Sequence, residues 1–291
     1  ETARLIVTAP PGKVIVVSRF GVSAAALHGA LSFVLGPLLF RLRWRPFVGI
    51  PHERVIAIHL HLAVIGCVTL LIIAVGRTLV PMLAVAPVAP RRKWPTVEIA
   101  ITIGLWLSIS GFAFGQRWPI VLGTLAIVAA VGRFFALAVR AAATRRVPSL
   151  EGPLLHALAG LGFLVQAGAL TILMLGHPLD SRTLAAYVVS LVVGWASGVT
   201  LGHVGKLLAI SAWTSWPPGP RPKQAAFYDR FAWTAEVIVF SFGCELLVVG
   251  TLVEGVAVAR AGAVLLVLSS VLALRGAHST IALRSSPGVG R

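Results

Sequence analysis

The stretch PHERVIAIHLHLAVIGCVTLLIIAVGRTLVP, Pro51–Pro81, decides how the rest of the chain is interpreted. It is hydrophobic over a length that can cross a bilayer, which takes about 20 apolar residues in a helix. Two histidines, His59 and His61, lie inside it, and ionisable side chains within a span are candidates for function because an unpartnered polar group is costly in hydrocarbon. Positions i and i+2 of a helix lie about 200° apart, so the two imidazoles are expected to point to opposite sides. They either serve two sites, or one ligates a metal while the other packs against a neighbouring helix.

The order His59-x-His61, followed by Gly66 and then Pro81, resembles the histidine-bearing helix of subunit I of the haem–copper oxidases. The spacing from the pair to Gly66 is also similar to that of the NnrS family of haem- and copper-containing membrane proteins, although Leu62 replaces the acidic residue that follows the pair there. The resemblance covers about one helix. It implies that His59 serves an oxygen-reducing haem and His61 a low-spin haem.

The composition is that of a polytopic membrane protein. Of the 291 residues, 57% are hydrophobic and only 12% are charged. The net charge of +16 would indicate nucleic acid for a soluble chain. Here the basic residues lie mostly between apolar segments, so we interpret them as topology determinants and contacts to lipid headgroups of the bilayer, and expect no nucleic-acid partner. Cys67 and Cys244 fall inside spans and form no C-x-x-C motif, so neither a disulfide framework nor covalent haem attachment is indicated.

Eight spans follow when the chain is divided at charges, prolines and tryptophans. We expect an all-α transmembrane bundle forming one domain over 1–291, with spans at approximately 20–40, 52–77, 96–114, 119–139, 152–175, 183–212, 231–252 and 257–274. The basic residues concentrate on one side of this arrangement. The positive-inside rule therefore predicts cytoplasmic termini, and we expect a multi-pass protein of the plasma (inner) membrane.

Five histidines lie inside these spans. At 1.5 Å per residue in a core about 30 Å thick, His28, His61 and His203 are expected near the midplane, His59 nearer the outside and His156 nearer the cytoplasm. Three histidines at one depth on three helices favour a ligand site. We therefore expect His61 as first ligand, with His203 or His28 opposite it, and His59 and His156 as further candidates.

Buried carboxylates are few. Glu245, deep in the seventh span, is expected to carry a proton or to accept a hydrogen bond from a ligating histidine. Glu236 lies nine residues earlier, on the opposite face of that helix. Glu98 is expected to pair with Arg133 across the hairpin of the third and fourth spans.

These features favour an integral b-type haem protein that transfers electrons, with one or two haems held by histidines; copper is the weaker alternative. The resemblance implies six histidines for a complete oxidase, so a reduced relative acting in a respiratory or oxygenase complex, or on nitric oxide, fits better. Any enzyme activity would be that of an oxidoreductase, and other membrane subunits or a redox partner are expected. Two alternatives stay open: a transporter for metals or small solutes, and an accessory subunit without cofactor. Paired mid-span breaks would favour the transporter, and the sequence shows no obvious pair.

Overall fold

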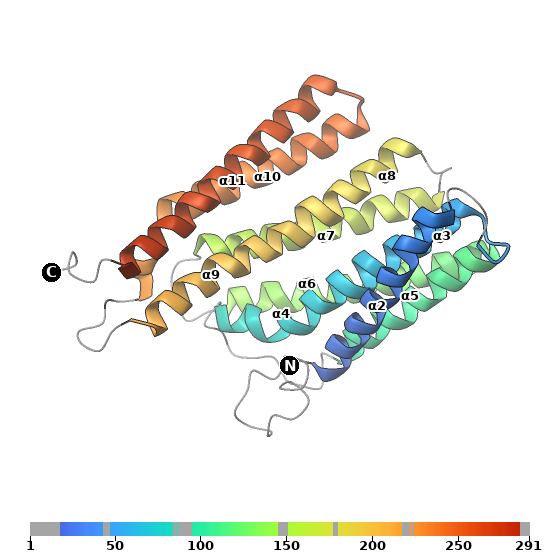
Figure 1. Ribbon diagram of the computed structural model, residues 1–291, viewed down its shortest axis with the longest axis horizontal. Helices are drawn as coiled ribbons and strands as arrows, with labels where there is room; N and C mark the ends of the chain where they lie inside the picture. The colour runs from blue at the N-terminus through green and yellow to red at the C-terminus, as the bar shows by residue number, and fades with distance from the viewer. Residues whose placement is uncertain are drawn as a thin grey trace. The chain divides into compact units, whose positions relative to one another are not determined.

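A computed structural model describes residues 18–42, 47–83, 86, 95–144, 151–176, 180–216, 222 and 224–285. Within these ranges the chain is helical, and a bridge between Phe47 and Ile50 is the single β contact (Figure 1). Eight helices are long and apolar enough to cross a membrane. The prediction of an all-helical, eight-span membrane bundle is therefore confirmed.

The chain divides into two compact units, Glu1–Arg146 and Val147–Arg291. The helices of unit 1 are α2 (Arg19–Leu42), α3 (His52–Leu60), η1 (His61–Thr69), α4 (Leu70–Leu83), α5 (Pro95–Phe114) and α6 (Arg117–Ala143). Those of unit 2 are α7 (Gly152–Gly176), α8 (Ser181–Val188), η3 (Val189–Ser197), α9 (Gly198–Thr214), the short 3₁₀ helix η4 (Gln224–Phe227), α10 (Arg230–Leu252) and α11 (Val256–Ser285).

Each unit repeats one plan of four spans. The spans are 23, 30, 20 and 27 residues long in unit 1, and 23, 34, 23 and 27 residues long in unit 2. In both units the second span is the longest, and nine residues within it are π-helical: η1 lies between α3 and α4, and η3 lies between α8 and α9. π-Helical segments are rare and occur frequently at functional sites. The sequence showed no obvious pair of mid-span breaks; the structure has instead a pair of π-helical segments within continuous spans.

Small residues bring the helices of unit 1 into close contact. Along the hairpin of α5 and α6, a Cβ on Gly104 would lie 2.6 Å from the carbonyl oxygen of Gly123, and one on Gly123 would lie 2.3 Å from that of Gly104. Without a hydrophobic driving force in lipid, helices associate through such backbone approach. The tight turn that joins the two helices places Gly115 at φ +69°, a conformation that glycine adopts without strain.

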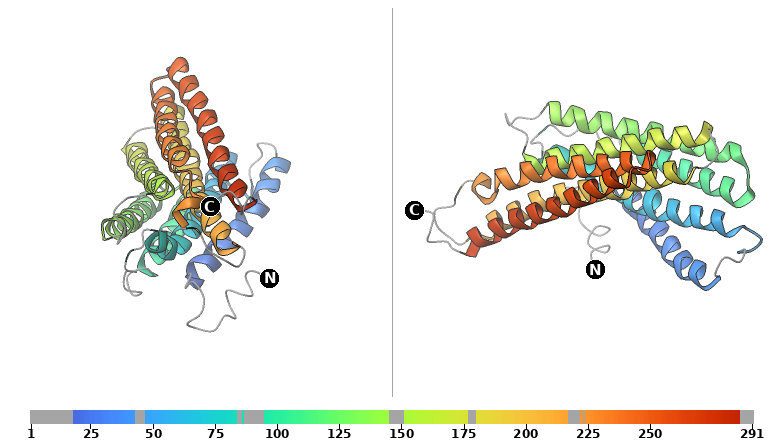
Figure 2. Two further views of the ribbon diagram at one scale, coloured as in Figure 1. Left: turned by 90° about the vertical axis from the view of Figure 1, so that its left-hand side faces the viewer. Right: turned by 90° about the horizontal axis from the view of Figure 1, so that it is seen from above.

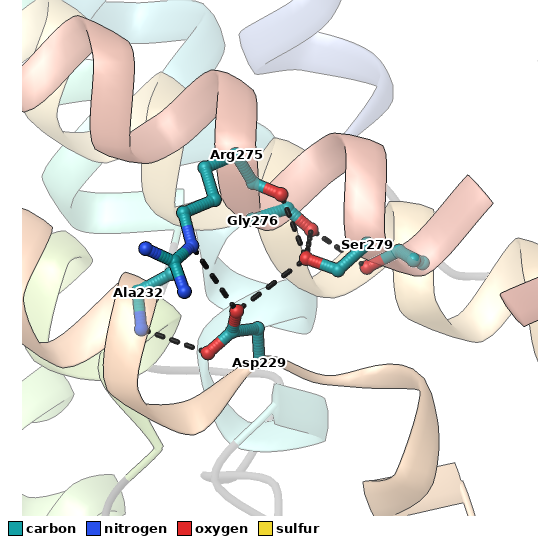
Figure 3. A network of polar contacts seen from close by, with 6 residues as sticks. Asp229, Ala232, Arg275, Gly276 and Ser279 are labelled. Carbon is teal, nitrogen blue, oxygen red and sulfur yellow. Dashed lines mark hydrogen bonds and ion pairs between the residues drawn. The ribbon is translucent and has the colours of Figure 1, made fainter. Parts of the chain in front are cut away.

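In unit 2, α10 and α11 run side by side along most of their length (Figures 1 and 2). Asp229 contacts both α10 and α11 at one end of this helix pair (Figure 3). Its Oδ1 accepts a hydrogen bond of 2.9 Å from the backbone N–H of Ala232, capping α10, while its Oδ2 lies 3.5 Å from the Ser279 hydroxyl and 3.9 Å from Nε of Arg275 on α11. The helix α11 continues to Ser285, well beyond the predicted end of the eighth span.

Candidate functional site: intramembrane histidines and buried carboxylates

The five candidate histidines are divided between the two units. Unit 1 contains His28 on α2, His59 on α3 and His61 at the start of η1, whereas unit 2 contains His156 on α7 and His203 on α9. Within the part of the chain that the structure describes, no group of three or more His, Cys, Asp or Glu side chains is arranged to hold a metal ion.

His28 is buried in the core of unit 1. It is 1% exposed, and its Nδ1 lies 3.2 Å from the carbonyl oxygen of Gly66 on η1. The close approach of the His28 ring to the backbone of η1 requires glycine at position 66, because a Cβ there would lie 2.8 Å from the ring. The ring of Trp106 on α5 lies at a centroid distance of 5.8 Å from the imidazole.

His59 and His61 contact different helices, as their two-residue spacing predicts. Nδ1 of His59 lies 3.1 Å from the carbonyl oxygen of Ser32 on α2. His61 instead turns toward α5, where its ring lies 4.9 Å from that of Phe112, and its Nδ1 lies 2.8 Å from the carbonyl oxygen of Ala57, one turn back on its own helix.

His28 and His61 do not share one level. Gly29 of α2 lies against Cys67, whereas Gly36 lies against His59. The level of His28 on the second span is therefore close to Cys67, six residues beyond His61, which corresponds to about 9 Å along a helix. The two histidines, both expected near the midplane, are therefore separated along the second span, and their depths in the bilayer stay a prediction.

In unit 2, His203 repeats the local geometry of His61. Its Nδ1 lies 2.7 Å from the carbonyl oxygen of Val199, one turn back on α9. Its Nε2 is buried and has no hydrogen-bond partner among the described residues. The neighbouring Gly202 packs against α7, because a Cβ there would lie 2.5 Å from the carbonyl oxygen of Pro153.

His156 forms the most buried polar contact of unit 2. Nδ1 of His156 lies 2.7 Å from Oε2 of Glu236 on α10, and both side chains are 0% exposed. The other carboxylate oxygen of Glu236 accepts a 2.7 Å hydrogen bond from the hydroxyl of Ser269 on α11. The imidazole packs on the ring of Phe240 at 4.5 Å, and its Nε2 has no hydrogen-bond partner in the described part of the chain.

Unit 1 contains a corresponding buried carboxylate. Glu98 on α5 is 1% exposed, accepts a hydrogen bond from the Ser18 hydroxyl just before α2, and has Nη1 of Arg77 on α4 at 3.6 Å from its Oε1. The predicted pair with Arg133 is not what the structure shows, since Arg133 lies on the exposed face of α6. In each unit, a buried glutamate on the third span thus contacts a polar side chain at the start of the first.

Glu245 occupies an exposed position on α10 rather than a buried one. Its Oε2 accepts a 2.9 Å hydrogen bond from the Gln166 amide on α7, and the Gln166 amide oxygen accepts one of 3.2 Å from Ser190 on η3. The expected bond to a histidine is therefore replaced by one to an amide. The residue that contacts a histidine is Glu236. The sequence alone favours Glu245, because that residue lies deeper in the seventh span.

One feature is common to all five histidines. In each, Nδ1 lies within 3.2 Å of an oxygen acceptor: a backbone carbonyl for His28, His59, His61 and His203, and a carboxylate for His156. A backbone carbonyl oxygen only accepts, so the proton of the neutral ring belongs on Nδ1 and the lone pair on Nε2 in the four histidines that contact one, His28, His59, His61 and His203. This is the tautomer that histidines adopt when Nε2 ligates a metal.

Comparison of the chain with profiles of known protein families, with characterised proteins and with solved structures gave no match. The fold and the side chains within it define a multi-pass helical membrane protein whose described spans contain five histidines, four of them with Nδ1 on a backbone carbonyl, and the buried carboxylates Glu98 and Glu236.

Proposed function

We propose that this chain is a b-type haem-binding redox protein of the plasma (inner) membrane, in which intramembrane histidines ligate iron through Nε2. The observation that carries the proposal is the placement of Nδ1 beside an oxygen acceptor in all five histidines. Each ring is thereby oriented, and its basicity raised, in the manner of metal-ligating imidazoles.

The two histidines of unit 2 support this most directly. Nε2 of His156 and Nε2 of His203 are buried without a hydrogen-bond partner in the described residues. A buried lone pair without a partner costs free energy in an apolar environment, and an iron atom would satisfy it. The donor set therefore fits an axial ligand. Bound haem would supply one-electron chemistry, while the apolar side chains around the histidines exclude water and influence the potential.

Unit 1 contributes His61 and His28 as candidates at separate levels, and His59 faces α2. Two levels in this unit fit two haems better than one, and copper is the weaker alternative. The function includes electron transfer, with any enzymatic activity that of an oxidoreductase, in a complex with other membrane subunits or with a redox partner.

The decisive experiment is a visible absorption spectrum and a pyridine haemochrome titration of the purified protein. We expect a Soret band and one to two b-type haems per chain. Protein that is folded by circular dichroism, expressed with haem supplementation and colourless would overturn the proposal.

The paired π-helical segments favour a second candidate, a proton-coupled transporter. They occupy the same place in two units of the same plan, and each unit contains a buried glutamate, Glu98 or Glu236, on its third span. Repeated units with irregular helices at matched positions are characteristic of secondary transporters. Proton uptake by proteoliposomes with a solute gradient, abolished by Glu98→Gln or Glu236→Gln, would favour this function.

A further inference from the structure

Unit 2 contains a groove whose lining extends to the His156–Glu236 contact. It has a volume of about 570 Å³ and is formed by η3, α9, α10 and α11. Its apolar lining consists of Val192, Val193, Ala196, Leu201, Phe240 and Leu266, and its polar lining consists of Ser197, Thr200, Ser269 and Ser270. We call it the serine groove. The volume is in the range of small-molecule binding sites.

The serine groove lies halfway along the spans. Ser197, Phe240 and Ser269 are each within one residue of the middle of their spans, Ser181–Thr214, Arg230–Leu252 and Val256–Ala282. Val192, Thr200 and Ser270 at its edge are exposed on the surface of the unit. A ligand must therefore reach the groove from the hydrocarbon core and be soluble in lipid.

Each of the four hydroxyl groups that line the serine groove donates its hydrogen in a hydrogen bond within the protein. Ser197, Thr200 and Ser270 donate to backbone carbonyls of their own helices, at 3.1, 2.6 and 3.0 Å. The fourth, Ser269, donates to Oε1 of Glu236 at 2.7 Å. A hydroxyl has one donor and two acceptor lone pairs, so the groove offers acceptors to a ligand and no free hydroxyl donor. It is complementary to a ligand that donates.

A chain of polar groups leads away from the groove. Ser269 is 1% exposed and contacts Glu236, which contacts His156, and the last two side chains are 0% exposed. A ligand hydroxyl that donates to Ser269 would join this chain, and neighbouring hydrogen bonds strengthen one another in a low-dielectric environment. The side chains of Phe240 and Leu266 provide apolar contact for a ring and a tail.

We propose that the serine groove binds a membrane quinol, a dihydroxyaromatic head on an apolar tail, and discriminates against the oxidised quinone. A quinol donates two O–H hydrogens, whereas the carbonyls of a quinone would face acceptor oxygens without a hydrogen between them. A ligand that leaves buried acceptors without a donor binds much more weakly than one that donates to them, so the quinone should bind more weakly than the quinol. The binding does not depend on the proposed haem, because every contact is with protein side chains.

The test is calorimetric titration of the full chain in nanodiscs with decylubiquinol and with decylubiquinone, using empty nanodiscs as the blank. We expect saturable binding of one decylubiquinol per chain, at least tenfold tighter than that of decylubiquinone, with or without haem in the preparation. Ala196→Phe, which fills the groove without touching the polar chain, should abolish it. Ala261→Phe, at an exposed alanine on α11 outside the groove lining, is the control for adding a phenylalanine to this unit and should bind as the parent protein does.

The polar contact is tested separately. Ser269→Ala should weaken decylubiquinol binding about tenfold and remove the preference over the quinone, while Ser269→Thr, which keeps the hydroxyl, should retain both. Equal affinity for quinol and quinone, unchanged binding in Ala196→Phe, or no heat beyond that of empty nanodiscs would each overturn the proposal. The last outcome would mean that lipid acyl chains alone fill the groove. A colourless protein that still binds the quinol would contradict the proposed haem function and would support the quinol site.

Discussion

Nδ1 of His156 and Oε2 of Glu236 lie 2.7 Å apart between α7 and α10, and neither side chain is exposed. A nitrogen and an oxygen at this distance are in direct ion-pair contact, so the two residues form one polar unit in the core. Glu236 is further held by Ser269 on α11. Three helices of unit 2 thus meet at this carboxylate.

Breaking this contact should be strongly destabilising. His156→Ala leaves a buried carboxylate with one fewer partner, and we expect a loss of about 3–5 kcal/mol in the free energy of unfolding. The measurement is unfolding by sodium dodecyl sulfate in mixed micelles, followed by circular dichroism. His278→Ala, at an exposed position of α11, serves as the control and should change little. The double variant His156→Phe with Glu236→Leu should be more stable than the sum of its single changes, and strict additivity would contradict the coupling.

Single histidine variants should identify the haem ligands. His61→Ala should remove the low-spin component of the visible and electron paramagnetic resonance spectra, because its Nε2 would be lost from iron. His203→Ala should lower the haem content of unit 2. His278→Ala is again the control. A spectrum that is unchanged in His61→Ala, with haem present, shows that His61 is not a ligand.

Gly66 is expected to tolerate no side chain. A Cβ there would lie 2.7 Å from Leu105 and 2.8 Å from His28, so Gly66→Ala should cost about 1–3 kcal/mol and displace the imidazole. Gly132→Ala in α6, where a Cβ would meet nothing within 4 Å, is the matched control in the same unit. The two variants are compared by detergent unfolding and, if haem is bound, by the position of the Soret band. Equal stability of both would refute the close packing at Gly66.

Asp229 should contribute more than its ion pair. Asp229→Ala removes the cap of α10 and the link to Ser279, and we expect a loss of about 1–2 kcal/mol. Arg275→Ala should have an effect within about 0.5 kcal/mol, because its guanidinium is 66% exposed and 3.9 Å from the carboxylate. If both substitutions cost the same, the ion pair rather than the cap stabilises this end of α10 and α11.

The topology remains a prediction from the distribution of basic residues. Eight spans place both termini on one side, and the positive-inside rule makes that side the cytoplasm. Alkaline phosphatase fused after Arg291 should be inactive, and a fusion truncated after Gly115, in the turn between α5 and α6, should be active. The reverse pattern would invert the protein in the membrane.

The spans were predictable from the sequence because crossing a bilayer requires an apolar segment of sufficient length, and such segments can be identified directly in the chain. The rotation of each helix was not, because it depends on packing between residues far apart in the chain. Arg77 therefore replaced Arg133 as the contact of Glu98, and Glu236 replaced Glu245 beside a histidine. The π-helical segments were missed for the same reason: the residues of η1 and η3 are ordinary helix formers, and nothing local in them indicates a wider turn.

The repeated plan of four spans has a consequence for how the chain can be divided. Four crossings return a polypeptide to the side from which it entered, so each unit is an even-numbered set of hairpins that a translocation machinery can insert without the other. A break in the chain after Arg146 separates the two without cutting a span. This protein is therefore compatible with an origin from two genes that each encoded one half, or from one gene that encoded the same half twice. Fragments expressed together should each insert independently, with every crossing in its native direction.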